Sequence, residues 1–181
     1  RGVKVTAEVT PQHLIFTDEA LRTFETRYKM NPPIRSDIHR DACVEGLVDG
    51  TIDAVVTDHA PHEWEEKDQE FNLAPSGFVG LETSVGAMLT HLYHTGIIDL
   101  MTMVNVMSTA QAKILGLDAG VIAPGKDADL TILDLDKEWT VDSSKFYSKG
   151  KSTPFDEMIF KGKAAAAIVN GKFVMKNGEV L

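Results

Sequence analysis

The chain has 181 residues, of which 43% are hydrophobic and 25% are charged, and these values are typical of globular proteins. They exclude a disordered tail, a collagen-like repeat and a disulfide scaffold. Acidic residues outnumber basic residues by 27 to 18, so the net charge of −9 argues against a nucleic-acid partner. No apolar run approaches the roughly 18 residues that a membrane-spanning helix needs. Cys43 is the single cysteine, which excludes an internal disulfide and favours the cytoplasm.

Two features concern the organisation of the chain. It starts with Arg1 instead of Met, and an alternating apolar segment follows almost at once, which suggests that sequence is missing upstream. The whole net charge lies in residues 1–125, which hold 18 acidic and 9 basic residues, whereas residues 126–181 hold 9 of each. Together with a change of pattern from Gly120 onward, this shift predicts one domain over residues 1–119 and a second over residues 120–181.

The first part of the chain alternates predicted strands and helices. Alternation predicts a strand over residues 3–9, helical spacing predicts a helix over 18–28, and Ser36 is the expected N-cap of a helix over 37–49. The apolar run 51–57 predicts a short buried strand of the parallel kind. A loop follows, and helical patterns return over residues 81–93, 99–107 and 109–115.

The second part of the chain contains short predicted strands separated by turn residues. Strands are expected over residues 121–122, 130–133, 166–169 and 172–175. The Asn170-Gly171 pair predicts a β-hairpin, and Asn177-Gly178 predicts a further turn. The order of elements therefore predicts an α/β unit followed by a small all-β unit.

The main candidate for chemistry is the motif DHAPH at residues 58–62, directly after the predicted buried strand. Carboxylate and imidazole groups suit both metal binding and proton transfer. In parallel α/β folds, residues just after the carboxyl end of a strand line the active site. The alternative is that these are polar loop residues that cap a helix.

A second candidate is the motif KMNPPIR at residues 29–35. The two prolines after Asn31 fix the backbone, which would hold the Asn31 amide ready to bind a polar ligand. Alternatively, the prolines simply end one element before the next helix. His13, in a turn after the first strand, is expected to have a structural role. The sequence contains no P-loop, no dinucleotide fingerprint and no G-x-S-x-G motif.

These motifs resemble those of bacterial-type dihydroorotases, which belong to the amidohydrolase superfamily. The segments that carry the resemblance are EVTPQHL at 8–14, KMNPPIR at 29–35, DHAPH at 58–62, GLET at 80–83, GVIAPGKDADL at 120–130 and KSTPF at 151–155. The resemblance covers essentially all 181 residues. It implies the C-terminal part of a metal-dependent hydrolase (β/α)8 barrel, a TIM barrel, over residues 1–119, followed by part of a small β-sandwich domain over 120–181.

The resemblance also implies roles for single residues. Asp58 matches the family's metal-ligating catalytic carboxylate, which passes a proton to the leaving ring nitrogen when the ring opens and takes it back when the ring closes. Asn31 and His62 match side chains that hold the substrate. The backbone around Ser76 and Gly77 matches a loop that also meets the substrate, although family members often have an aromatic residue in the place of Ser76.

The implied reaction is the reversible cyclisation of N-carbamoyl-L-aspartate to L-dihydroorotate in de novo pyrimidine biosynthesis, with one or two zinc ions. Because the other metal ligands of the family would lie upstream, the chain is expected to be inactive alone. The implied partners are the missing N-terminal half of the enzyme, a second copy in a homodimer, and aspartate transcarbamoylase.

Two other functions stay open on the sequence. The chain could belong to a sister cyclic amidohydrolase, an allantoinase or hydantoinase, against which Asn31 and His62 argue. It could also belong to a non-catalytic pseudo-dihydroorotase that binds aspartate transcarbamoylase, against which the presence of Asp58 argues.

Overall fold

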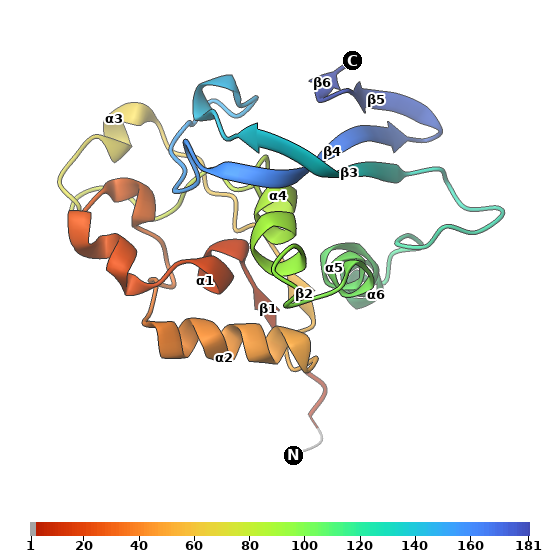
Figure 1. The fold of residues 1–181 in the computed structure, drawn as a ribbon, viewed down its shortest axis with the longest axis horizontal. Helices are drawn as coiled ribbons and strands as arrows, with labels where there is room; N and C mark the ends of the chain where they lie inside the picture. The colour runs from red at the N-terminus through yellow and green to blue at the C-terminus, as the bar shows by residue number, and fades with distance from the viewer. Residues whose placement is uncertain (1–2) are drawn as a thin grey trace. The chain divides into compact units, whose positions relative to one another are not determined.

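The computed structural model describes residues 3–181 (Figure 1). Their contacts form two compact units. The first unit contains residues 85–139 and 160–181 with the described residues 3–6, and the second contains residues 7–84 and 140–159. The chain therefore passes between the units more than once. The boundary expected between residues 119 and 120 stays a prediction.

The second unit is built around a short parallel pair of strands, β1 (Glu8–Val9) and β2 (Ala54–Val55), with Glu8 opposite Ala54 and Val9 opposite Val55. Both residues of β2 are buried, so the expected buried parallel strand is confirmed, although it is shorter than residues 51–57. The helical elements of this unit are α1 (Pro11–Ile15), η1 (Asp18–Thr23), η2 (Thr26–Tyr28), α2 (Asp37–Val48) and α3 (Trp64–Lys67).

One helix prediction in this unit is confirmed and one is wrong. The predicted helix over 37–49 is α2, and Ser36 is its N-cap in extended conformation. The predicted helix over 18–28 is instead two 3₁₀ helices, η1 and η2. Phe24 separates them with a φ of 54°, a left-handed conformation that a right-handed helix cannot contain.

An aromatic cluster joins the two segments of the second unit. The Phe155 ring, 1% exposed, lies 5.1 Å from the Phe16 ring and 6.2 Å from the Phe78 ring, measured between centroids. Backbone bonds add to this contact, because Val79 N–H donates to the Ser152 carbonyl at 2.8 Å. Residues 140–159 are therefore part of the core against which the 75–80 loop packs.

The helices of the first unit are more continuous than expected. α4 (Ser84–Met88) runs into the π-helical η3 (Leu89–Tyr93), which agrees with the predicted helix over 81–93. α5 (Leu100–Val104), the π-helical η4 (Asn105–Thr109) and α6 (Ala110–Leu115) follow one another without a break, so the two predicted helices are one helical stretch. No helix among residues 3–181 is long and apolar enough to cross a membrane.

A four-stranded sheet completes the first unit, in the order β3 (Leu130–Thr140), β4 (Ile159–Val169), β5 (Lys172–Lys176) and β6 (Glu179–Val180), as Figure 1 shows. The predicted hairpin is confirmed: Asn170 and Gly171 have φ values of 49° and 73° between antiparallel β4 and β5. The strand expected over 121–122 is wrong, because Ile122 is 89% exposed and residues 121–123 pair with no strand. The α/β class expected for the chain is confirmed.

Candidate active site

Asp58 lies three residues after β2, at the carboxyl end of the strand. Its backbone has a φ of 49°, in the left-handed region that Asp tolerates better than most residues. The side chain is exposed, and its carboxylate has no hydrogen bond or ion pair within the described part of the chain. The carboxylate is thus free to bind a ligand from outside these residues.

Asp58 does not form a metal site with neighbouring side chains. Within residues 3–181, no group of three or more His, Cys, Asp or Glu side chains could hold a metal ion. A catalytic zinc ion usually needs about three protein ligands. The described residues therefore provide one carboxylate suited to a metal ion, and they do not fit the ion by themselves.

The rest of the DHAPH motif is tied to the loop over residues 75–81. His59 Nδ1 accepts the backbone N–H groups of Gly80 at 3.2 Å and Leu81 at 3.3 Å. Ala60 N–H donates to the Phe78 carbonyl at 3.0 Å. His59 is therefore a structural acceptor that fixes the 75–81 loop beside the motif.

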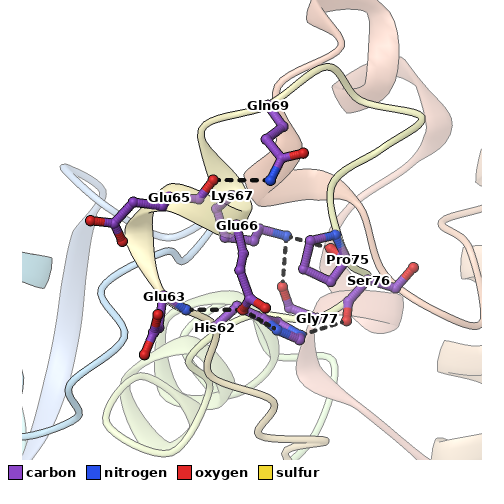
Figure 2. Close-up of polar contacts among 9 residues, drawn as sticks. All are labelled: His62, Glu63, Glu65, Glu66, Lys67, Gln69, Pro75, Ser76 and Gly77. Atoms are coloured by element: carbon purple, nitrogen blue, oxygen red, sulfur yellow. Dashed lines mark hydrogen bonds and ion pairs between the residues drawn. The ribbon is translucent and has the colours of Figure 1, made fainter.

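His62 is held on both sides of its imidazole ring (Figure 2). Its Nε2 donates to the Ser76 carbonyl at 3.0 Å, and its Nδ1 lies 3.3 Å from Glu66 Oε2. Glu66 belongs to the capping box of α3, in which it accepts the Glu63 N–H at 3.4 Å. These contacts orient the ring without using a metal ion.

Asn31 lies beside the same loop. It is exposed between Met30 and Ile34, which are 5% and 3% exposed, and its amide has no hydrogen bond within the described residues. The backbone two residues earlier contacts the loop, since Gly77 N–H donates to the Lys29 carbonyl at 2.9 Å. Asn31 thus has a free amide on a segment that is anchored on both sides.

His13 supports the segment that carries Asn31. Its Nε2 donates to the Pro32 carbonyl at 2.9 Å, and its Nδ1 lies 2.6 Å from the Thr10 hydroxyl. Both ring nitrogens are used, which confirms the structural role expected for this histidine.

Gly77 occupies a position that only glycine fits. Its φ is 122°, and a Cβ atom there would lie 2.6 Å from the Ala60 Cβ. Ser76, the residue before it, is exposed, and neither its hydroxyl nor its N–H has a partner within the described residues. Hydrogen bonds therefore bring together the 29–31 segment, His62 and the Ser76–Gly77 turn, whereas no described hydrogen bond joins Asp58 to any of them.

Sequence reasoning missed Lys67. The residue is only 3% exposed, and its Nζ donates to the carbonyls of Pro75 at 3.0 Å and Gly77 at 2.9 Å. Burial, together with the smaller effect of the Lys29 charge, lowers the pKa of this ammonium to about 8. Because Lys67 follows an acidic run at residues 63–66, the sequence favours a solvated loop and gives no signal of burial.

A surface pocket of about 340 Å³ lies next to the His62 turn, lined by Pro61, His62, Glu63, Trp64, Glu65, Lys149 and Gly150. Gly150 packs directly against the turn, because a Cβ atom at this position would lie 2.8 Å from the His62 carbonyl oxygen. The 140–159 segment thus supports the backbone of His62 from the side of the pocket.

Comparison with known proteins gives close relatives over nearly the whole chain. The chain is 49% identical to a dihydroorotase of Pelotomaculum thermopropionicum over 98% of its length, and 51% identical to one of Citrifermentans bemidjiense over 96%. It is 44% identical to a dihydroorotase of Bacillus subtilis over 99% of its length. The chain spans only 41–42% of the length of these relatives.

Solved structures also match nearly the whole chain. An L-hydantoinase (dihydropyrimidinase) from Arthrobacter aurescens is 37% identical with a TM-score of 0.93, covering 98% of this chain and 40% of that one. A dihydropyrimidinase from Brevibacillus agri is 26% identical with a TM-score of 0.90 over the same shares. The model of the amidohydrolase family matches residues 2–174. The chain therefore belongs to the amidohydrolase family.

Proposed function

We propose that this chain is the C-terminal part of a dihydroorotase, which interconverts N-carbamoyl-L-aspartate and L-dihydroorotate. The observation that carries the proposal is the identity of 44–51% to dihydroorotases over 96–99% of the chain. The L-hydantoinase structure, at 37% identity, is less similar. A hydantoinase or allantoinase activity is therefore the weaker alternative.

The substrate contacts in this proposal come from groups with free polar atoms. Asn31 offers its amide, and the Ser76–Gly77 turn offers the N–H and hydroxyl of Ser76. His62 borders the turn through its bond to the Ser76 carbonyl. The substrate carries a carboxylate and ring amide groups, which such donors and acceptors recognise.

The proposal includes a metal centre, with zinc as the metal and Asp58 as one ligand. When bound, such an ion would supply a nucleophilic water near neutral pH and would polarise the substrate carbonyl. The Asp58 carboxylate holds the proton that passes to the ring nitrogen when the ring opens. The other ligands are proposed to come from the part of the enzyme that lies outside these residues, which is why the chain is proposed to be inactive alone.

The test uses the complete enzyme that contains these residues, assayed with dihydroorotate, hydantoin and allantoin under the same conditions. We expect kcat/KM for dihydroorotate to exceed that for the other two substrates by at least about 100-fold, because a poorer substrate leaves polar groups of the site unpaired in the complex. Higher activity on hydantoin or allantoin would replace the proposal by the alternative. If the folded, metal-loaded enzyme acts on none of the three substrates, the protein is non-catalytic.

His62→Ala should mainly weaken substrate binding. Loss of the ring removes the bond that holds the Ser76 carbonyl, and we expect KM for dihydroorotate to rise by about tenfold with a smaller change in kcat. His39→Ala is the matched control, because His39 is an exposed histidine on α2 whose imidazole, within residues 3–181, bonds only the Ser36 hydroxyl, and it carries no proposed role. Equal kinetics in the two variants would remove His62 from the substrate site.

The remaining parts of the proposal rest on the family resemblance: a homodimer, a cytoplasmic location and an association with aspartate transcarbamoylase. Sedimentation of the complete enzyme alone tests the homodimer, and sedimentation of its mixture with aspartate transcarbamoylase tests the association.

A further inference from the structure

Three successive backbone carbonyls in the 75–77 turn are held by side chains (Figure 2). Lys67 Nζ donates to the first and third, at 3.0 and 2.9 Å, and His62 Nε2 donates to the second at 3.0 Å. The turn is therefore fixed in its orientation by two side chains on the stretch 62–67, which contains α3.

Lys67 is placed there at a cost in free energy. It is 3% exposed and forms no ion pair within the described residues, and its own carbonyl accepts the Thr26 hydroxyl at 2.6 Å. Burying an ammonium group is unfavourable unless its donors are satisfied. A methionine would fill a similar space without that cost, so the particular contribution of the ammonium is its pair of bonds to the turn.

These bonds set the direction of the neighbouring N–H groups. In a trans peptide unit, the carbonyl and the following N–H point in opposite directions. The Pro75–Ser76 peptide is trans, since the cis bond in the described chain is Asn31–Pro32. With the Pro75 carbonyl bonded to Lys67, the Ser76 N–H points away from Lys67, and it has no acceptor within the described residues.

We propose that Lys67 is a positioning residue for the substrate: its ammonium holds the carbonyls of Pro75 and Gly77 so that the Ser76 N–H is offered to a substrate oxygen. The substrate atom is a carbonyl or carboxylate oxygen of a cyclic amide. This inference rests on the proposed function, because it places the substrate beside the 75–77 turn.

The test is Lys67→Met in the complete enzyme, with Lys151→Met as the matched control. Lys151 also donates its ammonium to a backbone carbonyl, but to that of Phe146, outside the 75–77 turn. We expect Lys67→Met to raise KM for dihydroorotate by about tenfold with kcat changed less than about threefold, as for loss of one hydrogen bond to substrate. Lys151→Met should leave KM within about twofold.

A purely structural role would give a different result. It would lower the thermal midpoint and the yield of folded enzyme while KM stayed that of the wild type, and this result would overturn the proposal. Should Lys67→Met fail to fold, Lys67→Arg and Lys67→Gln decide the question. Arg keeps the charge and two donors and should keep KM close to that of the wild type, whereas Gln should raise it. Equal KM values for Arg and Gln would contradict the proposal.

The wild-type enzyme is assayed first, so that the two proposals fail separately. If it acts on hydantoin in place of dihydroorotate, the proposed function is wrong, and the same variants are then compared with hydantoin as substrate.

Discussion

Asp58→Asn should lower kcat of the complete enzyme by about 10²–10⁴-fold or more, the range typical of general acid–base catalysis. An amide has nearly the size of the carboxylate but cannot carry the proton between water and the ring nitrogen. The fold should be unaffected, because the left-handed φ of 49° at this position suits Asn as well as Asp. The thermal midpoint of the variant should therefore match that of the wild type.

The measurement combines steady-state kinetics with the metal content of the purified variant. Loss of turnover with full metal content would identify Asp58 chiefly as the proton carrier, whereas loss of both would identify it chiefly as a ligand. Asp127→Asn is the control, since Asp127 is also exposed and makes no side-chain bond within residues 3–181. Near-normal turnover of Asp58→Asn would remove this residue from the mechanism.

Gly77→Ala is expected to have the next largest effect. A residue with a side chain is strained at a φ of 122°, at a cost of about 1–3 kcal/mol. The added Cβ would also lie 2.6 Å from the Ala60 Cβ and 3.2 Å from His62 Nε2, so the turn must move away from the DHAPH motif. We therefore expect both a lower thermal midpoint and a rise in KM of at least about tenfold.

Gly50→Ala separates these two effects. Gly50 has a φ of 82°, but a Cβ atom at this position would meet nothing within 4 Å. The Gly50→Ala variant should therefore have a lower thermal midpoint, because of backbone strain, and an unchanged KM. If Gly77→Ala also leaves KM unchanged, the 75–77 turn does not contact the substrate.

Local sequence signals predicted the elements that depend on local interactions. Ser36 and the spacing after it indicate α2, and Asn170-Gly171 indicates the β4–β5 hairpin, because capping and turn conformations are set by neighbouring residues. The helix expected over residues 18–28 is interrupted at Phe24, whose left-handed backbone has no signal in the apolar pattern.

In the candidate site too, features with a local sequence signal could be predicted and features set by distant residues could not. The DHAPH motif could be placed after a buried strand from its position alone, and the roles of Asn31 and the Ser76–Gly77 turn came from the family resemblance. Lys67 and Gly150 could not be found in this way. Lys67 lies in a charged stretch and bonds a carbonyl ten residues later, and Gly150 contacts His62 across a long separation in sequence.

The two-segment composition of the second unit affects the order in which the protein forms on the ribosome. Residues 7–84 are made before residues 85–139, and residues 85–139 must be synthesised before the 140–159 segment appears. At roughly 5–20 residues per second, the synthesis of residues 85–139 takes about 3–11 s. Throughout that time the nascent His62 turn lacks Gly150, and Phe16 and Phe78 lack Phe155, so the apolar surface of the unfinished unit is open to chaperones.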